Sequence, residues 1–147
     1  MRVLGVDPAL RATGFALVEG RRLLHVETLR TKAPLGEALD EIYRATLRLI
    51  EELSPELVAL EEPIYFRNPK TALVMGSVRA AVLLAAVHKG VKAVEVNPVE
   101  VKIAAVGLGS ARKEQVRYMV RQLFGYEGDL TEHEADAAAV AWAASLK

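Results

Sequence analysis

Apolar and polar residues follow strand-like patterns in five segments of the chain. Residues 2–7 and 57–61 are short, nearly continuous apolar runs that each end in an acidic residue, as is typical of buried central strands. Segments 13–19 and 23–29 are rich in β-forming residues and are separated by three residues that include a glycine, which predicts a hairpin. A fifth strand is expected over residues 91–96.

Helical spacing marks the rest of the chain. Apolar residues recur every three or four positions over 35–53, and Ser54-Pro55 ends that helix. Asn68, Pro69 and Gly90 bracket a second helix through 72–88. The remaining helices are expected over 98–106, from an N-cap at Ser110 to Gly125, and from a capping box of Thr131 and Glu134 to Leu146.

The expected order of elements is β-β-β-α-β-α-β-α-α-α. Three antiparallel strands followed by βαβα units predict an α/β fold, with a mixed five-stranded sheet and helices on both faces. Right-handed crossovers place the fourth strand beside the first. Since no repeat, low-complexity tract or Ser/Gly-rich linker interrupts the pattern, we expect one domain over residues 1–147.

Composition narrows the class of protein. The 147 residues are 52% hydrophobic and include no cysteine, which argues against a disordered chain and excludes a disulfide framework or a cysteine nucleophile. The longest apolar run, 80–87, is far shorter than the ~20 residues of a membrane span. The first seven residues are strand-like and do not resemble a signal peptide, so the cytoplasm is the expected compartment.

The net charge of zero conceals a segregation of charge along the chain. Lys and Arg number 19, as do Asp and Glu, a balance that by itself argues against a nucleic-acid-binding protein. Residues 1–66 nevertheless carry a net charge of −3, residues 67–121 one of +7 and residues 122–147 one of −4. The basic middle segment is therefore a candidate surface for an acidic partner.

Two acids stand at the ends of strands that are expected to be neighbours. Asp7 ends the first strand and Glu61 the fourth, so their carboxylates should converge at the edge of the sheet where α/β proteins bind ligands. Clustered carboxylates repel one another unless a hard cation such as Mg²⁺ binds. Alternatively, each acid simply meets solvent at a strand end. Glu62 rivals Glu61; strand alternation favours Glu61 slightly, but the pattern alone leaves the choice open.

The last expected helix begins with several acids and a histidine. His133 and Asp136 are three residues apart and share a face, where an imidazole and a carboxylate could hold a metal or transfer a proton. Alternatively, acids in a first turn merely complement the helix dipole. His133-Glu134 begins like a zinc-protease motif, but Ala137 stands where the second histidine belongs, so that chemistry is excluded.

Basic residues of the middle segment are candidates for binding phosphate. Lys113, Arg117 and Arg121 follow at intervals of four and form one stripe opposite the apolar face of their helix. Lys102 and Arg67 belong to the same basic segment. Such a face is most often plain solvated surface. Beside an acidic metal site, however, it suits a phosphodiester substrate.

Two further segments carry unusual apolar surface. Tyr65 and Phe66 lie in the connector after the fourth strand, where they either pack beneath the loop or stack on bases. Residues 72–88 are apolar almost all round, whereas a helix that covers one sheet face needs only a stripe. Tight burial of its many alanines is one explanation; we favour a second buried face in a homodimer.

The motifs together resemble the RuvC family of Holliday-junction resolvases, within the RNase H-like superfamily. The resemblance runs through nearly the whole chain. It includes G-V-D-P with T-G after the acid, V-A-L-E-E before an aromatic loop, and K-T-A-L-V-M-G-S-V-R-A-A-V in the apolar helix. The two most specific motifs are V-E-V-K-I-A-A-V-G-L-G-S-A-R-K-E-Q-V and H-E-A-D-A-A-A-V-A.

The resemblance implies a role for each matching residue. It chooses Glu61 over Glu62 and identifies the catalytic and metal-binding set as Asp7, Glu61, His133 and Asp136. Lys102 and Lys113 match lysines near the scissile phosphate, Tyr65 and Phe66 match the loop whose aromatics stack at the junction crossover, and the apolar helix matches the dimer helix. Two departures are Ala9, which replaces the glycine of the usual D-P-G turn, and the lack of the extra tail that many members carry after the last helix.

The resulting hypothesis is a homodimeric endonuclease that cuts four-way DNA junctions by symmetric paired nicks. Two Mg²⁺ or Mn²⁺ ions per site are expected to support hydrolysis, and Lys102, Lys113, Arg117, Arg121, Tyr65, Phe66 and Arg67 are expected to contact DNA. The family also implies cooperation with a RuvAB branch-migration complex. The alternatives are a related RNase H-like nuclease acting on RNA or other branched DNA, and an inactive dimeric DNA-binding scaffold.

Overall fold

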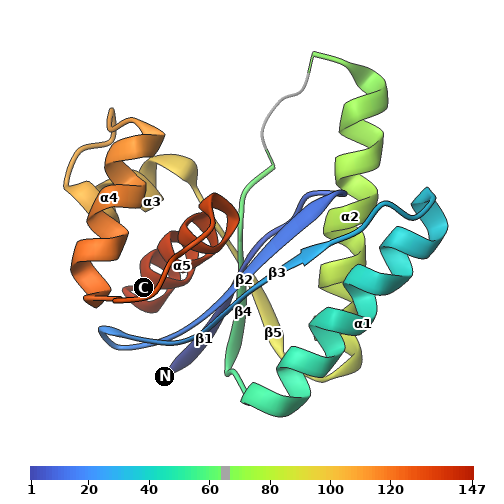
Figure 1. Cartoon of the computed structure of the whole chain (residues 1–147), viewed down its shortest axis with the longest axis horizontal. Coiled ribbons are helices and arrows are strands. Elements are labelled where there is room, and N and C mark those ends of the chain that lie inside the picture. Colours follow the sequence, from blue (N-terminus) through green and yellow to red (C-terminus); the bar gives the residue numbers. More distant parts are fainter. Residues whose placement is uncertain (64–66) are drawn as a thin grey trace.

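A five-stranded sheet forms the centre of the protein (Figure 1). The structure, a computed structural model, describes residues 1–63 and 67–147. The strand order is β3-β2-β1-β4-β5. The strands are β1 (Arg2–Asp7), β2 (Ala12–Glu19), β3 (Arg22–Arg30), β4 (Leu57–Glu61) and β5 (Lys92–Val96).

The pairing of the strands confirms the expected mixed sheet. β1, β2 and β3 pair in antiparallel fashion, whereas β4 runs parallel to β1 and β5 runs parallel to β4. In the central pair, Val6 lies opposite Leu60, so the residues that follow them, Asp7 and Glu61, end adjacent strands at the same edge. The crossover rule that predicted this neighbourhood is therefore confirmed.

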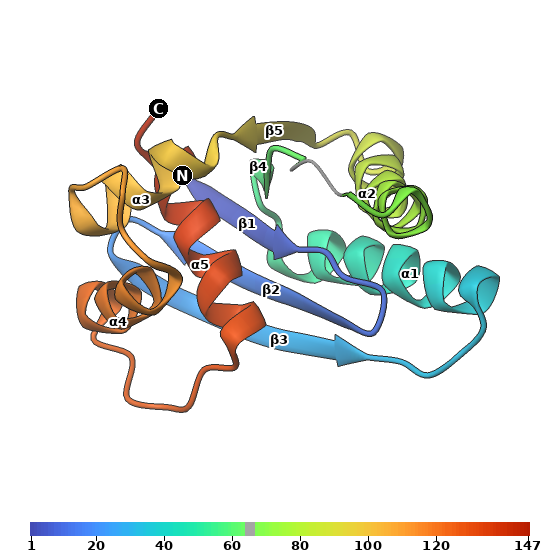
Figure 2. The ribbon, with the colours of Figure 1, turned by 90° about the horizontal axis from the view of Figure 1, so that it is seen from above.

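In the part of the chain that the structure describes, five helices cover the two faces of the sheet (Figure 2). On one face α1 (Leu35–Leu53) and α2 (Pro69–His88) pack over an apolar cluster that includes Phe15, Ile42 and Val82. On the other face α5 (Glu132–Ser145) lies directly on the strands, with α3 (Pro98–Val106) and α4 (Lys113–Phe124) packed against it. The prediction of helices on both faces is confirmed.

The close approach of α5 to the sheet depends on small residues. Seven of its fourteen residues are alanines that are buried. Two glycines complete the fit: a Cβ at Gly5 would lie 2.0 Å from the carbonyl oxygen of Ala137, and one at Gly14 would lie 2.2 Å from that of His133. Any larger residue at these positions would push α5 away from β1 and β2.

The helix ends largely match their expected caps. Asn68 accepts hydrogen bonds from the backbone of Lys70 and Thr71, and Gly125 ends α4 with φ = 56°. The capping box of α5 is also confirmed, since Thr131 and Glu134 each accept from the other's backbone N–H.

The predicted N-cap at Ser110 is wrong. The helix begins at Lys113 and its N-cap residue is Arg112, whose backbone N–H donates to Oε1 of Gln115 at 2.8 Å. A glutamine at the third helical position caps this end in place of the serine, because its side chain reaches back over the first turn.

Helix α2 keeps much apolar surface uncovered. By length and composition it could span a membrane, yet only 22% of its most apolar window is buried. Val78, Val82, Ala85 and Ala86 face the interior, whereas Leu73 and Val87 are 74% and 70% exposed. The intramolecular packing of α2 therefore accounts for one of its faces only.

Candidate active site

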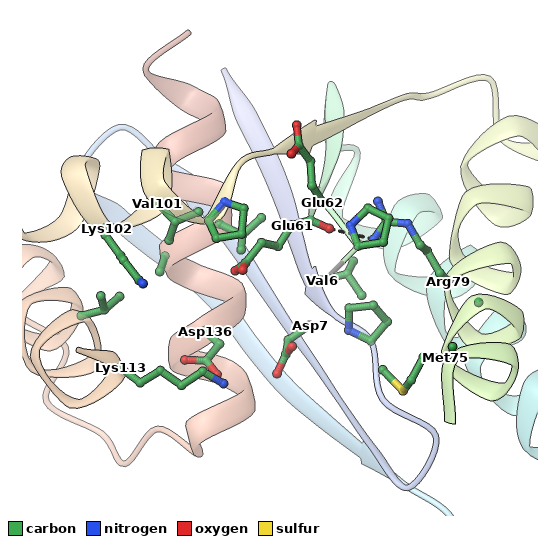
Figure 3. Close-up of a pocket in the computed structure, with 18 residues that line it drawn as sticks. Val6, Asp7, Glu61, Glu62, Met75, Arg79, Val101, Lys102, Lys113 and Asp136 are labelled. Atoms are coloured by element: carbon green, nitrogen blue, oxygen red, sulfur yellow. Dashed lines mark hydrogen bonds between the residues drawn. The ribbon is translucent and has the colours of Figure 1, made fainter. Parts of the chain in front are cut away.

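Two carboxylates meet where the central strands end. Asp7 and Glu61 are the last residues of β1 and β4, and both line a pocket of about 400 Å³ at this edge of the sheet (Figure 3). Leu60 and Val6, the residues just before them, are fully buried and fix the direction in which the acids emerge. The alternation of a strand thus delivers both carboxylates to the pocket.

The first turns of α5 add a histidine and a third carboxylate. His133 Nδ1 donates to Oδ2 of Asp7 at 3.0 Å, and Asp136 lines the same pocket. The i, i+3 spacing predicted this shared face. Because Nδ1 is bonded to Asp7, the lone pair of a neutral His133 ring is on Nε2, the nitrogen available to a ligand.

A tie to β3 fixes the position of this helix end. Oγ1 of Thr28 donates to the buried Glu134 at 2.7 Å and also lies 2.7 Å from Oγ1 of Thr131. With Gly14 lying beneath His133, these contacts set the height and the rotation of α5 above the sheet. The positions of His133 and Asp136 are thus determined by packing outside the pocket.

Burial and mutual repulsion perturb the carboxylates. Burial raises the pKa of Asp7 above its ordinary value, although the hydrogen bond from His133 opposes the rise. Burial also raises the pKa of Glu61, and the negative charges of Asp7 and Asp136 raise it further. Asp7 and Glu61, whose ionisation is opposed by burial and by neighbouring negative charge, form a site that gains from a bound cation.

Glu62 points away from this cluster. Glu62 also lines the pocket, but Figure 3 shows its carboxylate directed away from those of Glu61, Asp7 and Asp136, and Asn97 Nδ2 donates to its Oε2 at 3.4 Å. The alternation argument that slightly favoured Glu61 agrees with this placement.

Two lysines face the acids from the other side of the pocket. Lys102 comes from α3 and Lys113 from the start of α4 (Figure 3). Both helices are fixed to α5 through Trp142, which donates to the carbonyl oxygen of Ala104 at 3.0 Å and packs edge-on against Phe124. The positive charges of Lys113 and Lys102 oppose the rise in the pKa of Glu61 without cancelling it.

The basic stripe of α4 differs from its expected form. Lys113 is exposed, but Arg117 turns inward: its Nε and Nη2 donate to the two carboxylate oxygens of Asp136, each at 3.0 Å. Arg121 is partly buried and donates to the carbonyl oxygens of Arg117 and Leu130. The structure therefore does not show the expected single exposed stripe, because Asp136 on α5 accepts from Arg117, and the carbonyl oxygens of Arg117 and Leu130 accept from Arg121.

Of the remaining predicted DNA contacts, the structure describes Arg67. Arg67 is exposed just before the Asn68 cap. Tyr65 and Phe66 lie outside the described residues.

Sequence reasoning overlooked Arg79. It lies in α2, lines the pocket, and its Nη1 donates to the carbonyl oxygen of Glu61 at 2.7 Å, while Nη2 lies 2.7 Å from Oε1 of Glu95. This residue fixes the end of β4 to α2 and so positions Glu61. A lone charge within an otherwise apolar helix was the signal that could have revealed it.

The donor chemistry fits a hard divalent cation. Carboxylate oxygens and an imidazole nitrogen are suitable ligands for Mg²⁺ or Mn²⁺. Across residues 1–63 and 67–147, however, no three Asp, Glu or His side chains lie close enough together to hold one ion. One of the candidate ligands, Asp136, is paired with the guanidinium of Arg117.

Comparison with known proteins agrees with this geometry. The family model described as Crossover junction endodeoxyribonuclease RuvC matches residues 3–144. The chain belongs to the RuvC family. A curated member from Moorella thermoacetica is 44% identical, with 96% of this chain and 89% of the relative covered. One from Syntrophotalea carbinolica is 42% identical, with 96% and 91% covered.

Solved RuvC structures confirm the expected fold class. The structure of Thermus thermophilus RuvC superposes with a TM-score of 0.88 at 35% identity, covering 99% of this chain and 93% of that one. T. thermophilus RuvC in complex with Holliday junction substrate gives a TM-score of 0.89 at 33% identity, with 99% and 92% covered. The yeast mitochondrial resolvase Ydc2, at 15% identity and a TM-score of 0.64, shares the fold.

Proposed function

We propose that this member of the RuvC family cleaves four-way DNA junctions by paired symmetric nicks and that Asp7, Glu61, His133 and Asp136 are its catalytic, metal-binding residues. Nucleases of this family are metal-dependent. The observation that carries the assignment is the convergence of three carboxylates, from β1, β4 and α5, on one pocket whose opposite wall bears two lysines.

The side chains divide the work at a phosphodiester. Asp7, Glu61 and Asp136 supply carboxylate oxygens, and His133 supplies Nε2 while its Nδ1 stays bonded to Asp7. Two Mg²⁺ or Mn²⁺ ions, when bound, would provide Lewis acidity for the attacking water and the leaving 3′-oxygen. Lys102 and Lys113 hold the non-bridging oxygens and offset the repulsion between the acids and the phosphate.

DNA contacts extend outward from the lysines. Arg67 is exposed just before α2. That Tyr65 and Phe66 stack on bases at the junction crossover stays a prediction from the family resemblance. Arg117 and Arg121 remain candidates for phosphate binding. Unlike Arg67, each would first have to break its hydrogen bonds to acceptors within the protein. The junction named for the T. thermophilus complex is the same class of substrate.

A homodimer through α2 accounts for the surface that the fold leaves open. Leu73, Leu84 and Val87 are exposed at spacings that place them along one side of the helix, in line with the small residues Gly76 and Ala80. A second copy packing on this stripe buries it and provides two active sites for two nicks. Arg79, paired on the inner side of the same helix, disfavours a membrane span.

Two further expectations accompany the function. The cytoplasm, predicted from the sequence, is the compartment in which we place an enzyme acting on chromosomal DNA. Cooperation with a RuvAB complex stays a prediction from the family.

The substrate class is tested by incubating the purified protein with a labelled four-way junction, a linear duplex and single-stranded RNA, each with and without Mg²⁺ or Mn²⁺. We expect paired nicks in the junction only, and only with metal. Preferential cleavage of RNA or of other branched DNA would support the alternative nuclease. Junction binding without any cleavage would support the inactive scaffold.

A further inference from the structure

Arg117 makes a contact that its place in the basic segment did not predict. The guanidinium grips Asp136 through two parallel hydrogen bonds of 3.0 Å, and the two side chains are only 17% and 24% exposed. Its Nη1 also lies 3.5 Å from Oε1 of Glu132, which is 73% exposed.

These two hydrogen bonds engage the carboxylate of Asp136, which the proposed active site uses as a metal ligand. An ionised carboxylate has about four lone-pair positions, and the guanidinium fork takes one on each oxygen of Asp136. It also places a full positive charge where a divalent cation would approach. A metal ion that binds Asp136 must therefore displace the guanidinium or share the carboxylate with it, and both cost binding free energy.

A second acceptor lies within reach of the released side chain. Glu132 stands one helical turn before Asp136 and already borders Nη1, so a small rotation transfers the guanidinium from one carboxylate to the other. The fork also matches the geometry of a phosphate group. Release of Asp136 thus need not leave the arginine without a partner.

We propose that Arg117 is a positioning residue that competes with the divalent cation for Asp136, holding this carboxylate in the metal-free protein and lowering the affinity of the site for metal. The proposal rests on the proposed function, since it takes Asp136 to be a metal ligand. It explains why, in the described part of the chain, carboxylates that line one pocket do not form a ready-made cation site.

The test is Mn²⁺ binding by the whole chain without DNA, measured by titration calorimetry. Arg117→Gln should bind Mn²⁺ about tenfold more tightly than the wild type, because a charge-assisted fork no longer competes. Arg44→Gln is the control: it removes the same charge from an exposed pair on α1, in which Nε of Arg44 donates to both carboxylate oxygens of Asp40, and its affinity should be unchanged.

Arg117→Lys distinguishes the effect of the two parallel hydrogen bonds from the effect of the positive charge. It is also the test variant if Arg117→Gln does not fold. Lysine keeps the charge but cannot bind both oxygens, so its Mn²⁺ affinity should lie between those of the wild type and Arg117→Gln. Affinities in both variants equal to or weaker than that of the wild type would overturn the proposal, since they would mean that the arginine does not oppose the metal.

Asp136→Asn distinguishes a failure of this inference from a failure of the proposed function. It should weaken Mn²⁺ binding in both the wild-type and the Arg117→Gln background. If it does so while Arg117→Gln alone changes nothing, only the competition is wrong. If Asp136→Asn leaves Mn²⁺ binding unchanged, the assigned ligand set fails and the competition fails with it.

Discussion

Contacts from neighbouring elements hold the acids of the pocket: His133 with Asp7, Arg79 with the carbonyl oxygen of Glu61, and Arg117 with Asp136. Neighbouring strand ends predicted that Asp7 and Glu61 would meet, and helical spacing predicted a shared face for His133 and Asp136. The choice of Glu61 over Glu62 and the joining of the two pairs came from the resemblance to the RuvC family. The contact between Arg117 and Asp136 could not be predicted, because it depends on how α4 is rotated against α5, which helix periodicity does not encode. The role of Arg79 was missed for the same reason: its acceptors come from β4 and β5.

Burial of Asp7 is expected to make the protein less stable than it would be with a neutral residue at this position. Burial raises the pKa of Asp7 in the folded state, so folding opposes its ionised form at neutral pH. Asp7→Asn should therefore stabilise the metal-free protein by up to about 1 kcal/mol, seen as a rise of a few degrees in Tm in the presence of a chelator.

The pH dependence of that gain has a defined sign. As pH falls through the folded-state pKa, the wild-type carboxyl becomes protonated and recovers the lost stability, so the difference in Tm should shrink. Asn in place of the exposed Asp129 is the control and should leave Tm unchanged. A lower Tm for Asp7→Asn than for the wild type at neutral pH would contradict the claim that the buried, ionised Asp7 destabilises the fold.

At the scale of elements, nearly every helix and strand could be predicted, whereas the contacts that fix α5 could not. Its position depends on Gly5 and Gly14, whose sequence neighbourhoods look like ordinary strand. The N-cap was wrongly predicted at Ser110 because serine is a common N-cap residue. In the structure the side chain of Gln115 caps the helix at Arg112 instead. Alternation and periodicity identify elements, but they do not report how closely two of them approach.

Gly14→Ala tests whether this close approach positions the active site. The added Cβ would collide with the backbone of His133 and force the start of α5 outward. We expect a loss of about 1–3 kcal/mol in the free energy of unfolding and a fall of about a hundredfold in junction cleavage. Gly36→Ala in α1, where nothing lies within 4 Å of the added methyl group, should reduce neither quantity. Equal behaviour of the two variants would contradict the role of Gly14.

At the scale of the whole molecule, the neutral net charge is the sum of opposed regions. The acids of the outer segments include the proposed metal ligands, and the basic middle segment provides Lys102 and Lys113 on the opposite wall of the same pocket. The segregation of charge along the chain is visible in the sequence. That acidic and basic residues line opposite walls of one pocket is visible only in the fold.

Lys113→Ala tests the phosphate-binding side of this arrangement. Removing one phosphate contact should weaken junction binding and reduce the slope of log K against log salt by about one. Lys147→Ala, at the far end of α5 and paired with Glu100, should leave the slope unchanged. The same slope in Lys113→Ala as in the wild type would remove this lysine from the DNA interface.

Leu84→Glu tests the second copy on α2. A charge on the exposed apolar stripe should convert the dimer to a monomer in sedimentation or light-scattering measurements, because the glutamate would be buried without a partner. Leu35→Glu, which replaces a similarly exposed leucine on α1, should remain dimeric. A dimer that survives Leu84→Glu would place the subunit contact elsewhere.

The central claim is that the acids at the strand ends cut a junction that other residues bind. It is tested most directly by measuring binding and cleavage of one labelled four-way junction, with Mg²⁺, by the wild type and Asp7→Asn. We predict paired nicks by the wild type, and by Asp7→Asn undiminished binding with no detectable cleavage. Cleavage by Asp7→Asn at the wild-type rate would contradict the claim.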